Sequence, residues 1–172
     1  MDLTSKVNRL LAEFAGRIGL PSLSLDEEGM ASLLFDEQVG VTLLLLAERE
    51  RLLLEADVAG IDVLGEGIFR QLASFNRHWH RFDLHFGFDE LTGKVQLYAQ
   101  ILAAQLTLEC FEATLANLLD HAEFWQRLQR KLGVMDIQAY ALEHSITDDE
   151  HNAIKGNFPV EFQLDLFREY AA

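Results

Sequence analysis

The spacing of apolar residues predicts a helix at the start of the chain. Apolar side chains recur every three or four positions over residues 7–18, a period that places them on one helical face. Thr4 or Ser5 can cap the first turn, and Gly19 is a typical residue just beyond a helix end. The sequence therefore predicts about four helical turns before the first strand.

Three short apolar runs follow, at residues 30–35, 41–47 and 52–58. Charged, turn-like segments separate them, which predicts an antiparallel meander. The second and third runs contain consecutive leucines, Leu43 to Leu46 and Leu52 to Leu54. Because successive strand residues point to opposite faces, these strands are apolar on both faces. An antiparallel sheet normally keeps one face polar, so we expect another element, a second protomer or a ligand chain to cover the second face.

A second helix and a hairpin are predicted next. Residues 82–88 and 94–101 alternate apolar and polar side chains around a turn at residues 89–93, which indicates a hairpin with one apolar face. The helix before it carries a stripe of large apolar residues, namely Ile68, Phe69, Leu72, Phe75 and Trp79.

A long third helix is predicted from its cap at Thr107 to Leu132, with Gly133 as its stop. The element order is then α-βββ-α-ββ-α, and the tight turns make the strand pairing antiparallel, which places the chain in the α+β class. We expect residues 1–133 to form one domain and residues 134–172 to form a C-terminal extension. The first part of this extension, residues 134–144, is predicted to form a helix. Residues 158–166 alternate as a strand would, although a helix is an alternative there. The extension is expected to pack on the same domain or on a partner protomer.

Composition narrows the class of ligand. The 172 residues carry 28 acidic and 14 basic side chains, a net charge of −14. Such a chain repels phosphate backbones and anionic membrane surfaces, so we expect neither nucleic acid nor membrane insertion. The polar N-terminus does not have the pattern of a signal peptide, and the single Cys110 indicates a reducing compartment, so a cytoplasmic location is predicted.

Catalytic and metal-binding patterns are weak. His78, His80 and His85 are close in sequence, but Arg77 and Arg81 flank them and no second half-site of Cys or His follows. Cys110 lies inside a predicted helix beside its apolar stripe, where nothing activates a thiolate. We therefore expect no enzyme activity, no cofactor and no metal.

The order of elements and several short motifs resemble the Tir chaperone (CesT) family of class I type III secretion chaperones. The similarity extends over residues 3–132. It includes the segment Leu25-Asp26-Glu27-Glu28-Gly29 before the apolar strands, the segment from Leu72 to Asn76, and the strand-turn-strand from Leu84 to Leu97. The extension after residue 133 departs from the family pattern.

The resemblance implies a bacterial homodimer that binds the N-terminal segment of a secreted effector in extended form. The implied effector groove uses the first helix and the doubly apolar strands, through Leu3, Val7, Leu10, Leu11, Phe14, Ile18, Leu43, Leu45, Leu52 and Leu54. The implied dimer interface uses the second helix and the hairpin, through Phe69, Leu72, Phe75, Trp79, Phe86 and Leu97. The sequence leaves open which residue of each alternating pair faces outward.

Two other functions remain possible at this point. The same fold can serve as a regulatory module that binds a cytoplasmic regulator in place of an effector. A small metal-dependent or thiol enzyme built on His78, His80 and Cys110 is the third hypothesis.

Overall fold

The computed structural model describes residues 2–60 and 66–134. Helix α1 (Leu3–Ile18) begins ahead of the predicted caps, because Asp2 is the N-cap. Its carboxylate accepts hydrogen bonds from the Ser5 backbone N–H and hydroxyl, both at 2.8 Å, and so satisfies a free amide of the first turn. Gly19 ends the helix as predicted, in the left-handed conformation that glycine adopts without strain.

Five strands form one antiparallel sheet in the order β1-β2-β3-β5-β4, which confirms the α+β class. Strands β1 and β4 are therefore the two edges. The strands of the sheet are β1 (Met30–Phe35), β2 (Val39–Leu46), β3 (Arg51–Gly60), β4 (His85–Asp89) and β5 (Lys94–Leu102).

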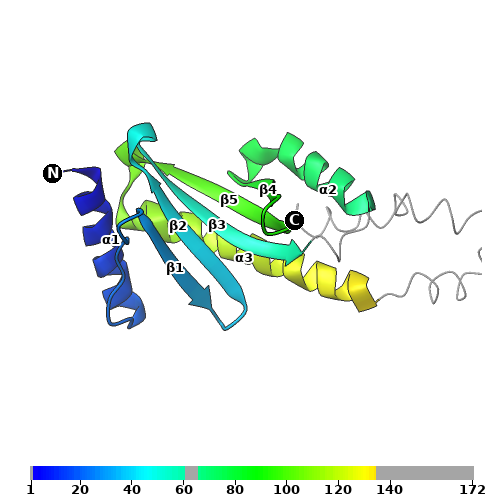
Figure 1. Ribbon diagram of the computed structural model, residues 1–172, viewed down its shortest axis with the longest axis horizontal. Coiled ribbons are helices and arrows are strands. Elements are labelled where there is room, and N and C mark those ends of the chain that lie inside the picture. Colours follow the sequence, from blue (N-terminus) through cyan, green and yellow to red (C-terminus); the bar gives the residue numbers. More distant parts are fainter. Residues whose placement is uncertain (1, 61–65, 135–172) are drawn as a thin grey trace, which may run out of the picture.

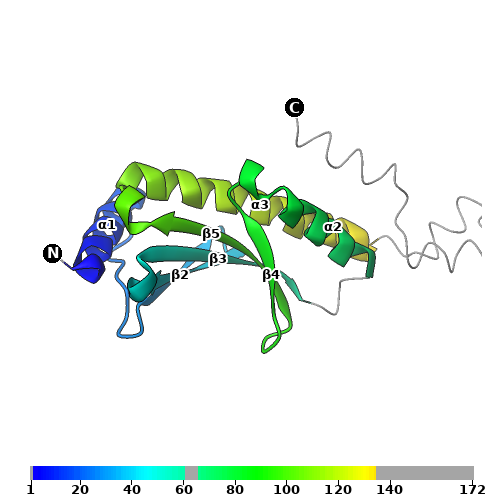
Figure 2. The same cartoon turned by 90° about the horizontal axis from the view of Figure 1, so that it is seen from above.

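The helices lie on one face of this sheet (Figures 1 and 2). Helix α3 (Leu108–Val134) runs along that face, α1 stands at one end of it, and α2 (Glu66–Arg77) lies towards the other end, beside β4. No described helix covers the opposite face of the sheet, which we call the outer face. Within the part of the chain that the structure describes, no helix has the length and apolar character needed to span a bilayer.

The core fills the space between the helices and the inner face of the sheet. Phe111 of α3 is fully buried, and the edge of its ring meets Phe14 of α1 with centroids 5.1 Å apart. At the other end, Phe75 of α2 stacks on Phe82 at 4.8 Å and meets Phe86 edge-on at 5.0 Å. These aromatic pairs fix both smaller helices to the layer formed by α3 and the sheet.

Three predicted element ends are wrong. Helix α2 ends at Arg77, so Trp79 lies outside its stripe, in a short 3-10 turn, and is 52% exposed. Strand β4 begins at His85, after Asp83 has taken a positive φ of 53° that an extended strand does not allow. Helix α3 continues through Gly133 to Val134, so this glycine does not stop it. An interior glycine costs only about 1 kcal/mol in a helix, which a long packed helix tolerates.

Candidate functional site

The doubly apolar strands divide their leucines between two environments. Leu43 pairs with Leu54 and Leu45 pairs with Leu52, and all four side chains are buried on the inner face. The alternate residues Leu44, Leu46 and Leu53 are half-buried on the outer face, where no described helix covers them. The question left open by the sequence is therefore answered: one leucine set builds the core, and the other forms an apolar strip on the outer face.

This division corrects the predicted groove. Eight of its ten residues are less than 9% exposed, so their side chains serve the core of the chain and leave no surface for a ligand. Of the remaining two, Leu3 packs partly buried against the core and Ile18 is 47% exposed at the end of α1. The core residues among the predicted groove set are Val7, Leu10, Leu11, Phe14, Leu43, Leu45, Leu52 and Leu54.

The predicted dimer residues need the same correction. Trp79 is exposed, whereas the side chain of Phe69 lies outside the described part of the structure. The others are buried by contacts within this chain and have no surface to offer a second protomer, namely Leu72, Phe75, Phe86 and Leu97.

The edge of the sheet at β1 has open backbone positions. The Leu45 N–H donates to the Gly29 carbonyl, and the Gln38 N–H donates to the Phe35 carbonyl, both at 2.9 Å. In an antiparallel pair the bonded positions alternate, so from Gly29 to Phe35 every second residue bonds towards β2. The intervening residues Ser32 and Leu34 therefore point their N–H and C=O groups away from the sheet.

The first outward position of β1 is already closed. The Met30 N–H donates to the Asp26 carboxylate at 2.8 Å, and its carbonyl accepts from the Asp26 N–H at 2.7 Å. The turn at Asp26 therefore stops any added strand at Met30. Two consecutive outward positions, Ser32 and Leu34, remain for pairing, and we call them the open edge.

At the opposite edge of the sheet, the backbone groups at the middle of β4 are already hydrogen-bonded to a side chain of α2. Phe86 of β4 is an outward position, and the Asn76 side chain bonds both of its backbone groups. Asn76 donates to the Phe86 carbonyl at 2.9 Å and accepts from its N–H at 2.7 Å. A strand that approaches β4 meets this side chain in place of free backbone, so β1 is the edge that favours strand addition.

Apolar side chains surround the open edge on both faces. Leu34 is 66% exposed on the outer face, where it lies opposite Gly40 of β2. On the inner side, Leu33 and Phe35 are only partly buried against the core. Figure 1 shows β1 as the outermost strand on this side, with α1 at one end of it. An added strand would therefore find apolar contacts for the side chains on either of its faces.

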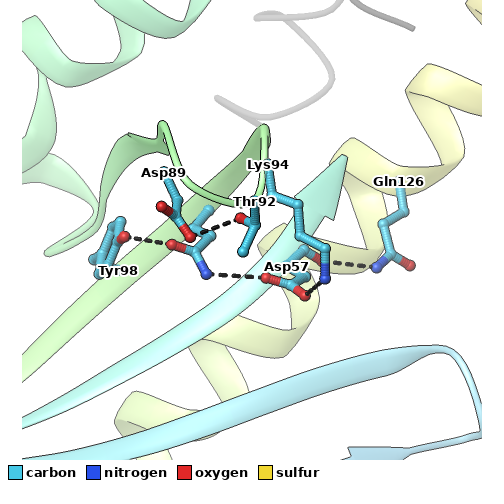
Figure 3. Close-up of polar contacts among 7 residues, drawn as sticks. Asp57, Asp89, Thr92, Lys94, Tyr98 and Gln126 are labelled. Carbon is cyan, nitrogen blue, oxygen red and sulfur yellow. Dashed lines mark hydrogen bonds and ion pairs between the residues drawn. The ribbon is translucent and has the colours of Figure 1, made fainter. Parts of the chain in front are cut away.

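The other half of the outer face is polar and acidic (Figure 3). The Tyr98 hydroxyl donates to Gln96 at 2.6 Å, and the Gln96 amide donates to Asp57 at 3.0 Å. Lys94 forms an ion pair with the same carboxylate at 2.5 Å. The pairing of β3 with β5 shifts register just beyond Asp57, whose carbonyl accepts from Gln126 of α3 at 3.0 Å. These bonds hold the β3–β5 surface in one arrangement.

Tyr98 also lies across the backbone of β4. His85 stacks on its ring with centroids 5.4 Å apart, and burial lowers the pKa of this histidine. Gly87 leaves the space that the ring occupies, because a Cβ atom there would lie 2.6 Å from Tyr98 Cε2. His85 and Gly87 both lie in the Leu84–Leu97 motif. The alternation of apolar and polar residues in this motif does not predict that Tyr98 stacks on His85.

Glu55 lies at the border between the apolar strip and the acidic half. Burial raises the pKa of Glu55 first, and the negative charges of Asp57 and Asp89 raise it further. The ionised form is therefore less favourable in the folded chain than in the unfolded chain. Stability from this residue is fully present below its ordinary pKa and is lost as the pH rises through the raised value.

The variant Glu55→Gln is accordingly expected to be more stable than the original chain at pH 7. The gain should stay below about 1 kcal/mol, because the carboxylate is partly screened by water. It should vanish near pH 4, where both chains carry a neutral side chain. Urea unfolding at several pH values measures the difference, and a gain that does not change with pH would contradict this account.

Comparisons with known proteins agree with this architecture. Residues 9–126 match the model of the Tir chaperone protein (CesT) family. A chain in the crystal structure of the ExsC-ExsE complex is 98% identical, with a TM-score of 0.72, over 75% of this chain and 97% of that one. The fold is also similar to a chain of the HopA1-SchA chaperone-effector complex, at 22% identity, a TM-score of 0.64, and 70% and 93% coverage.

A third similar structure is the Yersinia pestis type III secretion chaperone SycH in complex with a fragment of YscM2. It shares 18% identity and a TM-score of 0.56, over 69% of this chain and 98% of that one. At these low identities the last two structures show the fold alone.

Proposed function

This chain belongs to the Tir chaperone protein (CesT) family of type III secretion chaperones, and from that premise we propose that its open edge binds an extended segment of a partner protein. The observation that carries the proposal is the difference between the two sheet edges. Among the residues that the structure describes, none bonds the outward backbone groups of Ser32 and Leu34 at β1, whereas Asn76 closes β4 at Phe86. The partner segment adds a strand beside β1 and places apolar side chains next to Leu34 on the outer face or next to Leu33 and Phe35 on the inner side.

A partner segment that is disordered before it binds needs more contact than the two positions of the open edge provide. Each backbone hydrogen bond gained contributes only about 0.5–1.5 kcal/mol, so two positions alone cannot offset the cost of ordering a chain. The segment must therefore continue beyond the edge and cover more apolar surface. Ile18 and Leu20 at the end of α1 are further exposed apolar side chains that a longer segment could cover.

The first candidate partner is the second protein of the ExsC-ExsE complex, since one chain of that complex is 98% identical to this one. The general class is the N-terminal segment of a secreted effector. The alternative is a cytoplasmic regulator bound at the same edge. Export of the bound partner by the secretion system distinguishes an effector from a regulator that stays inside the cell.

We also propose that the chain is a homodimer, joined near the end of the molecule that carries α2 and β4. Large apolar side chains are exposed there, and Leu91 in the β4–β5 turn is 98% exposed. Trp79 and Phe88 add to this surface, which lies at the opposite edge of the sheet from β1. Dimerisation would bury these side chains and leave both copies of the open edge available.

The remaining expectations belong to the same proposal. The protein works in the cytoplasm, catalyses no reaction and binds no nucleic acid. Its net charge of −14 supports the last point, because phosphate backbones are repelled.

Co-expression of the full chain with the second protein of the ExsC-ExsE complex tests the proposal. We expect the two to purify together, and limited proteolysis to leave one continuous segment of the partner protected. Sedimentation of the free chain should give twice the 19.5 kDa chain mass. A partner that does not co-purify would contradict the binding proposal, and a mass of one chain would contradict the dimer.

A further inference from the structure

We propose that residues 158–166 of this same chain bind the open edge in the absence of the partner and compete with it. The inference rests on the proposed function, because it assigns a second ligand to the same site. These residues lie outside the described part of the structure, so the inference is drawn from their sequence, from the open edge and from the course of α3 as far as Val134.

The sequence of the segment matches what the open edge requires of a strand. Residues 158–166 read FPVEFQLDL, with apolar side chains at every second position. As a strand beside β1, the segment would turn its apolar set towards Leu33 and Phe35, whose side chains are only partly buried. Its polar set would then lie on the outer face beside Ser32 and Leu34, both of which are exposed to water. Pro159 falls near the start of the segment, where an edge strand tolerates it.

The segment can reach this edge. Glu123 and Arg127 of α3 line a cavity together with Asp36, Gln38 and Val39, so α3 passes beside the turn at which β1 ends. Helix α3 is described as far as Val134. The 23 residues 135–157 separate Val134 from Phe158, a length that spans up to roughly 80 Å when extended. Strand β1 has six residues and a length of about 20 Å.

The segment is also separate from the chaperone domain as the comparisons define it. The family match ends at residue 126, before the end of α3. The 98% identical chain of the ExsC-ExsE complex is matched over 97% of its own length, yet it accounts for only 75% of this chain. The competition would therefore be a property of this chain that the solved complex does not contain.

Because residues 158–166 belong to the same chain as the open edge, even weak binding between the two can compete with a partner. A flexible linker gives an attached ligand an effective concentration of about 1 mM. If the segment binds the edge with a Kd of about 0.1 mM, it weakens partner binding by roughly tenfold. Glu161 and Asp165 are two of the acidic residues that give the chain its net charge of −14, so mutual repulsion keeps the segment displaceable.

The test compares three full-length chains. In the double variant Val160→Asp/Phe162→Asp, the apolar set of the segment is disrupted, whereas Gln163→Ala changes only the polar set and serves as the control. The first readout is amide hydrogen exchange of Ser32 and Leu34 in the free proteins. We expect slow exchange in the original chain and in the control, and exchange at least tenfold faster in the double variant. Equal exchange in all three chains would overturn the inference.

The second readout is the affinity for the second protein of the ExsC-ExsE complex, measured by titration calorimetry. The double variant should bind about tenfold more tightly than the original chain, and the control should bind as the original does. If all three chains bind the partner with the same affinity, the segment does not compete with the partner, and the proposed function is unaffected. Loss of binding in all three chains would instead contradict the proposed function, while the exchange measurement still decides the inference.

Discussion

The substitution Ser32→Pro is expected to weaken partner binding by about 100-fold, which corresponds to about 2.7 kcal/mol. Proline removes the outward N–H at the centre of the open edge, and its ring occupies the space through which an added strand approaches. One hydrogen bond is lost directly, and the neighbouring position at Leu34 can no longer align with the ligand. The expected loss is therefore larger than the contribution of a single bond.

The fold itself should tolerate this proline. The Ser32 N–H points away from β2, so no bond within the sheet is lost. Ala31, which precedes it, already has the extended conformation that proline favours in its neighbour. Urea unfolding should show a change below about 1 kcal/mol.

Ser32→Ala is the matched control, because it removes the same hydroxyl and keeps the N–H. Its affinity should equal that of the original chain. Both variants are best compared in the Val160→Asp/Phe162→Asp background, in which the C-terminal segment cannot occupy the edge. If Ser32→Pro binds as tightly as Ser32→Ala there, the partner does not add a strand at β1.

The substitution Asn76→Ala is expected to destabilise the chain by about 3 kcal/mol. Both backbone groups of Phe86 lose their hydrogen-bond partner, and each such group costs about 1–3 kcal/mol when it is left unsatisfied in a buried position. Phe86 is only 6% exposed, so water replaces these bonds poorly. The Phe75–Phe86 ring contact is a second link between α2 and β4 here, and the substitution leaves it in place.

Ser74→Ala provides the control on the same helix. Ser74 is exposed, and its replacement should change the free energy of unfolding by less than about 0.5 kcal/mol. Urea unfolding of the three chains measures both effects. A loss below about 1 kcal/mol for Asn76→Ala would show that Asn76 does not hold the β4 edge closed.

Much of the fold could be predicted from local pattern. The helical stripe of α1, the turn at Gly19 and the alternation in β5 each report a local requirement, and the structure confirms them. The excess apolar character of β2 and β3 was also visible, because runs of leucine leave no polar face. That pattern alone indicates a second face that is covered or binds a ligand.

The side that each leucine faces could not be predicted. In β2, Leu43 and Leu44 are chemically identical, and only the position of α3 makes one a core residue and the other a surface residue. The predicted groove therefore took the inner set, Leu43 and Leu45, and missed the outer one. Leu97 was assigned to the dimer interface for the same reason, since its alternating pattern does not show which face is buried. In the structure its side chain is fully buried in the core.

The open edge itself was invisible in the sequence for a different reason. Which strands are edges depends on β5 inserting between β3 and β4, and this order is a property of the whole sheet. The outward direction of Ser32 follows from hydrogen bonds of its neighbours, such as that between Leu45 and Gly29. The role of Asn76 likewise depends on a bond between a helix and a strand. Neither contact leaves a periodic signal.

Amide hydrogen exchange of Ser32 and Leu34, with and without the partner, tests the central claim most directly. The full-length Val160→Asp/Phe162→Asp chain is the suitable protein, since its open edge is vacant before the partner is added. We predict fast exchange at both amides in the free protein and strong protection once the second protein of the ExsC-ExsE complex is bound. Exchange that stays fast at both amides in a saturated complex would contradict strand addition at β1.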